Sequence, residues 1–281
     1  MPAATRPGPT ATAESVLRTE SLEVTYANGS RALLSNSLSF RQGEFTVLLG
    51  TSGAGKSTLL RCLNGLVRPS AGRVFARDAG DLAEASALHR HRCRTGMVFQ
   101  QHHLIGRLSV LENVLTGRLG HHHPLATLLP PSRSEKELAL SAIDRVGLID
   151  QALKRADQLS GGQQQRVGVA RALVQSPSIL LADEPIASLD PATAERLLAL
   201  MHDICRSDGL TAVLSLHQIE FAKTFADRII GLAAGAIVFD GKPAQFSEEA
   251  ARRLYGNTIP ARHESPAPAR IFQHVSEGVP A

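Results

Sequence analysis

The chain has 281 residues, of which 43% are hydrophobic and 20% charged, and its formal net charge is +4. This composition is typical of a soluble globular protein with one large domain or two small ones, and the weak positive charge gives no indication of nucleic-acid binding. The cysteines Cys62, Cys93 and Cys205 lie far apart and form no CxxC pair. This spacing argues against a disulfide framework or a zinc motif and suits a reducing compartment.

Both ends of the chain are rich in proline and alanine. Residues 1–18 lack the apolar core of a signal peptide, and we interpret them and residues 257–281 as flexible tails around one folded domain, 19–256. The longest apolar run, from Ile229 to Phe239, is shorter than the roughly 20 residues that a membrane-spanning helix needs. A turn within this run divides it into two short strand-like pieces, so we expect a hairpin there and no membrane-spanning segment.

The predicted domain begins with strand-like segments at residues 21–26 and 44–50, followed by a helix from about Lys56 to Gly65. Between the second strand and the helix, GTSGAGKS fits the pattern GxxxxGK[ST]. The backbone N–H groups of such a loop form a nest for phosphate oxygens, and the helix N-terminus adds partial positive charge. The predicted nucleotide-binding residues are Gly50, Thr51, Ser52, Gly53, Ala54, Gly55, Lys56, Ser57 and Thr58. We expect Lys56 to reach the β- and γ-phosphates and the hydroxyl of Ser57 to bind Mg²⁺.

The middle of the chain, from about residue 102 to 159, shows helical patterns without clear strands, and we interpret it as an inserted helical subdomain. It ends at LSGGQQQRV, where Ser160 and Gln163 form an S-x-x-Q capping box. Glycine costs roughly 1 kcal/mol relative to alanine at a helix position. The pair Gly161 and Gly162 therefore indicates a helix start that a ligand approaches closely, although a well-capped helix is the simpler interpretation.

The α/β pattern then resumes, with predicted strands at residues 178–184 and 211–217 on either side of a helix. Such alternation predicts a mostly parallel sheet with ligands at the carboxyl ends of its strands. The first of these strands ends in Asp183, which suits Mg²⁺, and Glu184, which could accept a proton from an attacking water. We expect Pro185 to hold the backbone of Glu184 extended. Acidic residues at a strand end are often solvated turn residues, but the P-loop earlier in the chain favours a role in the site.

The loop GTSGAGKST, the segment LSGGQQQRV and the strand end LLADEP together resemble the ATP-binding subunit of an ABC transporter, and the resemblance covers about residues 22–255. It implies an α/β fold, a P-loop NTPase of the ABC type with a mostly parallel core sheet, an antiparallel β portion and the inserted helical subdomain. It also implies ATP and Mg²⁺ as cofactors and ATP hydrolysis as the activity, with Glu184 acting on the water.

Matching by motif position implies roles for further residues. Gln100 corresponds to the Q-loop glutamine, which contacts Mg²⁺ and relays to a membrane partner, and His217 corresponds to the switch histidine at the γ-phosphate. Tyr26 stands where the family places an aromatic ring against adenine. The signature loop comprises Leu159, Ser160, Gly161, Gly162 and Gln163, and the D-loop contributes Ser188 and Asp190.

In the family, the signature loop covers the ATP held by the P-loop of a second, head-to-tail subunit. Because this chain has one P-loop and one signature, the resemblance implies a second copy of the chain as partner. It further implies integral-membrane permease subunits, indirectly a periplasmic solute-binding protein, and a peripheral location on the cytoplasmic face of the inner membrane. No nucleic-acid partner is expected.

Two stretches, RLSVLENVL at 107–115 and ADEPIASLDP at 182–191, resemble phosphonate-import ATPase subunits. They imply import of phosphonates or related phosphorus oxyanions. Two alternatives stay open: an importer ATPase for another solute (phosphate, phosphite or an amino acid), and a non-import ABC ATPase of the cell-division or lipoprotein-release type. The histidines at 121–123 lack partner ligands at useful spacing, so we expect no metal site there.

Overall fold

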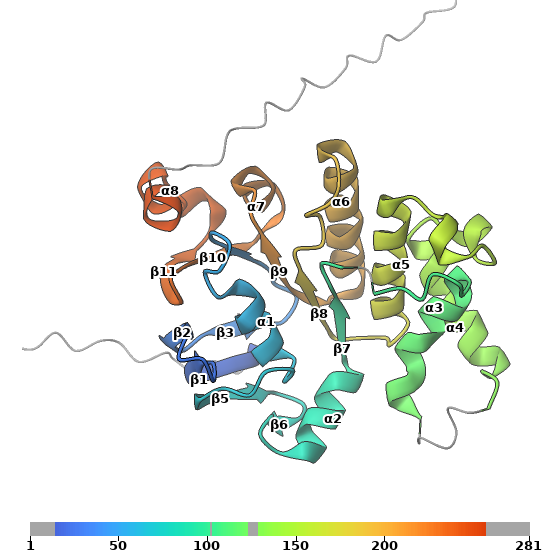
Figure 1. Cartoon of the computed structure of the whole chain (residues 1–281), viewed down its shortest axis with the longest axis horizontal. Helices are drawn as coiled ribbons and strands as arrows, with labels where there is room; N and C mark the ends of the chain where they lie inside the picture. The colour runs from blue at the N-terminus through green and yellow to red at the C-terminus, as the bar shows by residue number, and fades with distance from the viewer. Residues whose placement is uncertain (1–14, 102, 123–128, 257–281) are drawn as a thin grey trace, which may run out of the picture.

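The computed structural model describes residues 15–101, 103–122 and 129–256, and it is built on two β-sheets (Figure 1). The larger sheet has six strands in the order β11-β10-β4-β9-β8-β7, all parallel except for the antiparallel pair β10–β11. Its strands are β4 (Phe45–Leu49), β7 (Thr95–Val98), β8 (Ile179–Asp183), β9 (Thr211–Leu216), β10 (Arg228–Ala233) and β11 (Ala236–Gly241). Four of the parallel strands, β4, β9, β8 and the edge strand β7, are buried along their whole length because both faces of the sheet are covered. Two predictions are confirmed, the mostly parallel sheet and the hairpin within residues 229–239, which is formed by β10 and β11.

The smaller sheet is antiparallel and forms the predicted antiparallel β portion. Its strands are β1 (Ser15–Thr25), β2 (Arg31–Asn36), β3 (Ser39–Arg41), β5 (Ala71–Ala76) and β6 (Gly80–Asp81). Strand β1 begins at Ser15, four residues before the domain start that was predicted at residue 19. Val16 and Leu17 are buried, and Leu17 lies opposite residues of both β3 and β5, so these residues belong to the core.

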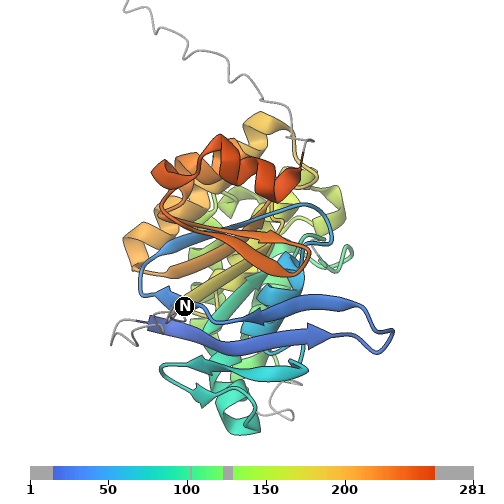
Figure 2. The same cartoon turned by 90° about the vertical axis from the view of Figure 1, so that its left-hand side faces the viewer.

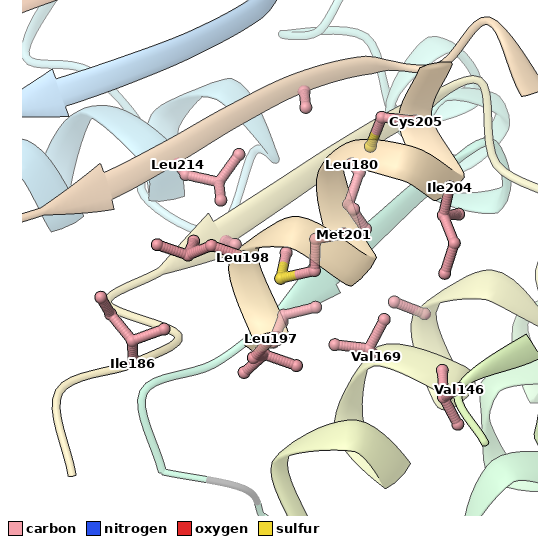
Figure 3. Packing of buried hydrophobic residues seen from close by; sticks show 14 of the residues in the cluster. Val146, Val169, Leu180, Ile186, Leu197, Leu198, Met201, Ile204, Cys205 and Leu214 are labelled. Carbon is pink, nitrogen blue, oxygen red and sulfur yellow. The ribbon is translucent and has the colours of Figure 1, made fainter. Parts of the chain in front are cut away.

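Helices separate the two sheets and cover the outer face of the larger one (Figures 1 and 2). Helix α1 (Lys56–Leu63) lies between the sheets and contributes Leu59, Leu60 and Leu63 to their shared core, while α2 (Ala85–Cys93) packs against β6 and β7. The opposite face carries α6 (Pro191–Asp208), α7 (Ile219–Phe225), the short turn η5 (Pro243–Gln245) and α8 (Glu248–Tyr255). Figure 3 shows this second core, in which side chains of α6 lie close to Leu180 of β8 and Leu214 of β9.

The segment between β7 and residue 159 was predicted to be helical, and its described residues form short helices and turns. They are α3 (Val110–Leu115), η1 (Thr116–His121), α4 (Arg133–Arg145), η3 (Ile149–Gln151) and η4 (Ala156–Gln158). Helix α5 (Gly161–Leu173) follows and packs against α3, α4 and β7. Within the described ranges, none of the helices is long and apolar enough to cross a membrane.

Candidate active site

Four segments predicted to carry function leave the same edge of the larger sheet. The P-loop follows β4, Glu184 follows β8, His217 follows β9, and Gln100 follows β7 two residues after its last residue. These strands are neighbours in the order β4-β9-β8-β7, and their register sets Asp183 opposite Ser215. Parallel strands end at one edge, so segments that are far apart in sequence meet there.

The P-loop needs glycine at two positions because other backbone segments press against it. A Cβ on Gly50 would lie 2.2 Å from the carbonyl oxygen of Leu232, and one on Gly55 would lie 2.5 Å from that of Ala32. Gly55 is also the N-cap of α1, and no side chain caps this helix. The first backbone N–H groups of α1 are therefore available to donate hydrogen bonds to an anion.

Lys56 is buried and turned back onto its own loop. Its Nζ donates hydrogen bonds to the carbonyl oxygens of Gly50 at 2.9 Å and Thr51 at 3.0 Å, and it lies 3.8 Å from Oε1 of Glu184. Burial lowers the pKa of Lys56, while the charges of Glu184 and Asp183 act in the opposite direction. The ammonium group is thus held among oxygen atoms that a phosphate could replace.

Asp183 lies in a network of hydroxyl groups. Its Oδ1 accepts hydrogen bonds from Ser57 at 2.7 Å and from Ser215 at 3.0 Å, and Arg61 lies 3.8 Å from its Oδ2. The carboxylate is 4% exposed, so these contacts satisfy a charge that solvent hardly reaches. A hydroxyl and a carboxylate oxygen side by side are the hard ligands that Mg²⁺ prefers when phosphates and water complete its coordination.

Glu184 pairs with His217: Oε1 of the carboxylate lies 2.6 Å from Nε2 of the imidazole, which donates when its proton is on Nε2. The expectation that Pro185 keeps Glu184 extended is wrong, because Glu184 has φ = +47°. The backbone N–H of Glu184 donates to Ser215 Oγ at 2.8 Å. This bond and the contacts of the carboxylate outweigh the local preference of a residue before proline.

Two residues in the site were not identified from the sequence. Ser215 touches both Asp183 and Glu184, and the hydroxyl of Tyr255 donates to the carbonyl oxygen of His217 at 3.1 Å. A signal for Ser215 existed, since it is a polar residue in an apolar strand two positions before His217 and so on the same face of the sheet. Tyr255 stands in α8 outside every motif, and burial raises its pKa to about 12.

The structure places Tyr26 beside the first turn of α1. The residue is 40% exposed, and its hydroxyl shares a hydrogen bond of 3.1 Å with Oγ1 of Thr58. Gln100 is exposed after the end of β7, and within the described residues no hydrogen bond joins it to Ser57 or Asp183. Its predicted contact with a metal stays a prediction.

The signature loop forms the N-terminus of α5 and carries the predicted capping box. Ser160 Oγ accepts from the N–H of Gln163 at 3.3 Å, and Gln163 Oε1 accepts from the N–H of Ser160 at 3.0 Å. Helices α5 and α1 contribute to the cores on opposite faces of the larger sheet, and Figure 1 shows them well separated. The two glycine-rich loops of one chain therefore lie in different parts of the molecule.

The D-loop leads into α6. Asp190 is the N-cap of this helix and accepts from the N–H of Thr193 at 3.0 Å, while Ser188 is exposed. Hydrogen bonds from the hydroxyl and backbone of Thr193 lower the pKa of Asp190. In this chain, Asp190 thus stabilises a helix start.

His121 is the last residue of the turn η1 and His122 follows it, whereas His123 lies outside the described residues. His122 contacts Glu135, and burial lowers the pKa of His121. Over the described part of the chain, no three His, Cys, Asp or Glu side chains form a cluster that could hold a metal ion.

Comparison with known proteins gives consistent matches. The family described as ABC transporter matches residues 33–187. The phosphite import ATP-binding protein PxtA of Stutzerimonas stutzeri is 55% identical over 92% of this chain and 94% of its own length. The phosphonates import ATP-binding protein PhnC 2 of Cupriavidus metallidurans is 58% identical over 89% of this chain and 90% of its own length.

Solved structures agree with these matches. The structure of cbiO1 from Clostridium perfringens, part of the ABC transporter complex cbiONQ, has a TM-score of 0.74 at 28% identity and covers 85% of this chain and 94% of that chain. The dimeric structure of the bacterial ABC transporter cassette MJ0796 has a TM-score of 0.71 at 34% identity and covers 81% and 98%. The α/β fold, the P-loop between β4 and α1, and the matched family together show that this chain belongs to the ABC transporter family.

Proposed function

We propose that this protein is the ATP-hydrolysing subunit of an importer for phosphonates or related phosphorus oxyanions. The observation that carries the solute class is the similarity over most of the chain to one phosphonate and one phosphite import ATP-binding protein. The observation that carries the chemistry is Glu184, whose carboxylate lies between Lys56 and His217 at the P-loop.

In the proposed cycle, the phosphates of ATP bind to the free N–H groups at the start of α1. The γ-phosphate takes the place of the carbonyl oxygens of Gly50 and Thr51 as the acceptor for Lys56, which satisfies the buried ammonium with a full negative charge. Lys56 and Glu184 lie 3.8 Å apart, so this carboxylate is already close to where the γ-phosphate would lie. Glu184 then accepts the proton of the attacking water, and His217 orients the carboxylate of Glu184 through their hydrogen bond.

The residues present fit Mg²⁺. Ser57 Oγ and Asp183 Oδ1 offer two oxygen ligands 2.7 Å apart, a small set that suits an ion completed by phosphate oxygens and water. When bound, Mg²⁺ neutralises negative charge that develops on the phosphate oxygens. Gln100 is proposed as an additional contact from the end of β7.

The separation of the two loops supports a second copy of the chain as the first proposed partner. Because Ser160 to Gln163 start α5 and the P-loop starts α1, each ATP needs the signature loop of a second, head-to-tail copy. The dimer works with integral-membrane permease subunits at the cytoplasmic face of the inner membrane. A periplasmic solute-binding protein delivers the oxyanion to the permease.

ATP binding and turnover of purified variants test the chemistry. Lys56→Ala should lose ATP binding because it removes the buried cation, whereas Glu184→Gln should bind ATP and lose turnover by at least about 100-fold. Glu137→Gln, an exposed change on α4, is the matched control and should behave like wild type. Normal turnover by Glu184→Gln would remove the proposed base.

Growth tests the solute. A strain lacking the gene should fail to grow with a phosphonate or phosphite as the only phosphorus source, and it should grow on phosphate. Wild type should restore growth and Glu184→Gln should not. Unchanged growth on every source, in a strain without a second importer, would contradict import of these oxyanions while leaving the ATPase measurement valid.

A further inference from the structure

Ser215 is a buried hydroxyl in the middle of the candidate active site. It lies on β9 directly opposite Asp183 and is 0% exposed, in a strand whose other residues are mostly apolar. A buried hydroxyl in this sheet does not always form a hydrogen bond. In the described residues, Oγ1 of the equally buried Thr46 on β4 has no partner. The bonds that Ser215 makes are therefore specific to its position.

Ser215 joins two consecutive residues with different proposed tasks. Its Oγ donates to Oδ1 of Asp183 at 3.0 Å and accepts from the backbone N–H of Glu184 at 2.8 Å. A serine hydroxyl has one proton, and here that proton is directed to the carboxylate while a lone pair faces the N–H group. Both bonds fix the same rotamer of Ser215.

The backbone between these two residues is unusual. In a regular strand, consecutive side chains point to opposite faces, which would put Asp183 and Glu184 on opposite sides of the sheet. Glu184 instead adopts φ = +47°, and its Oε1 lies 2.6 Å from His217. A left-handed conformation costs a residue with a side chain roughly 1–2 kcal/mol. It persists only where surrounding contacts enforce it, and Ser215 makes one of them.

We propose that Ser215 is a positioning residue for ATP hydrolysis. It holds the turn at Glu184, so that this carboxylate faces the P-loop, and it keeps a hydrogen bond on Asp183 when the Ser57 hydroxyl turns to a metal ion. The inference rests on the proposed function, because it needs Glu184 to act on water.

A purely structural role for the same hydroxyl would give a different result. Thr211, at the other end of β9, provides the comparison, since its buried hydroxyl accepts from the N–H of Gly43 at 3.1 Å far from the P-loop. Removing either hydroxyl leaves a backbone N–H without its partner and lowers stability. Only the loss at Ser215 should change catalysis.

The experiment compares Ser215→Ala, Ser215→Cys and Thr211→Val in the full chain by thermal unfolding and by steady-state ATP hydrolysis. We expect both Ser215 variants to lower kcat by about tenfold or more, with KM for ATP within about threefold, because the P-loop is unchanged. Cysteine keeps the volume but forms only weak hydrogen bonds, so it separates hydrogen bonding from packing. Thr211→Val should lower Tm and keep the wild-type kcat.

Two results would overturn the proposal: a wild-type kcat in either Ser215 variant, or a loss of kcat in Thr211→Val as large as in Ser215→Ala. If Ser215→Ala does not fold, Ser215→Cys decides. A wild-type protein without ATPase activity would instead contradict the proposed function, so the two failures are distinguishable.

Discussion

Gly162, the second glycine of the signature loop, faces the side chain of Thr193 in the first turn of α6. A Cβ built on Gly162 would lie 2.8 Å from Cγ2 of Thr193, whereas one on Gly161 would meet nothing within 4 Å. The two positions therefore favour glycine for different physical reasons. Packing against the Thr193 methyl already disfavours a side chain at 162, and the open space at 161 leaves room for a ligand from outside the chain.

Gly162→Ala should lower the free energy of unfolding by about 1–3 kcal/mol, because the new methyl overpacks against Thr193. Thr193→Ser removes the Cγ2 methyl and should restore stability in the double variant, to which alanine adds its better helix propensity. Urea unfolding of both single variants and the double variant measures this coupling. Additive changes, without recovery in the double variant, would contradict the steric explanation.

Motif spacing predicted which residues would meet in the site, and the structure brings Lys56, Ser57, Asp183, Glu184 and His217 together. They could be identified because Asp183, Glu184 and His217 stand at or directly after strand ends, and Lys56 and Ser57 begin the helix that follows the P-loop. The conformation of Glu184 and the parts played by Ser215 and Tyr255 could not be read in this way. They depend on contacts between residues more than thirty positions apart, which local preferences do not encode.

At the scale of the elements, helix α4 packs against α3 and α5, and a charged pair also joins its C-terminal end to the C-terminal end of α6. Arg145 in the last turn of α4 donates two hydrogen bonds, of 2.7 and 2.9 Å, to the carboxylate of Asp208 at the end of α6. Both side chains are about one-third exposed, at 34% and 36%. A bidentate ion pair of this kind fixes the relative orientation of the two helices more than it adds stability.

Arg145→Ala should change the free energy of unfolding by less than about 1 kcal/mol and yet increase hydrogen exchange in α4, since the helix loses its anchor to α6. Arg133→Ala at the other end of α4 is the control, because the ion pair that the structure describes for Arg133 joins it to Glu137 in its own helix. Exchange that stays unchanged in the Arg145 variant would show that apolar packing alone holds this helix.

Element types were easier to predict than their limits. The helix from Lys56 and the hairpin at residues 229–239 follow from glycine placement and apolar runs, and both are present. The start of β1 was missed because Ser15 to Arg18 directly follow a proline-rich segment and pair with β3 and β5, which are distant in the chain. Register with distant strands, rather than local composition, sets that boundary.

At the scale of the whole molecule, two cores on opposite faces of one sheet bury groups that titrate only at high pH. Burial raises the pKa of Cys62 and Cys205 from 9.0, and that of Tyr255 from 10.0, to about 12 in each case. Cys62 lies in the core under the smaller sheet and Cys205 in the core under α6. Each core therefore disfavours a charge that the unfolded chain carries freely.

Stability should fall as the pH rises above about 9. Between the unfolded and folded pKa values, the unfolded chain has released protons that the folded chain retains, so the free energy of unfolding decreases with pH. The two thiols together give a slope of about 2–3 kcal/mol per pH unit near pH 10. Lys56 acts in the opposite direction because burial lowers its pKa.

Urea unfolding at pH 8, 9 and 10 measures this slope. Cys205→Ala should reduce it by about half of the thiol contribution, and Cys93→Ala, which changes a thiol outside the two cores, should not. An equal slope in all three proteins would show that other groups control the alkaline limit.

The hydrogen bond from Tyr255 to His217 determines where this chain can be shortened or joined to another protein. Every strand of both sheets is complete at Gly241, and the match to the family ends earlier still, at residue 187. A chain cut at Gly241 would keep its sheets but lose the hydroxyl that holds the backbone of His217 and the Leu254 side chain that lies against Gly231. The smallest working unit therefore extends through α8, and a tag or fusion partner belongs after residue 256.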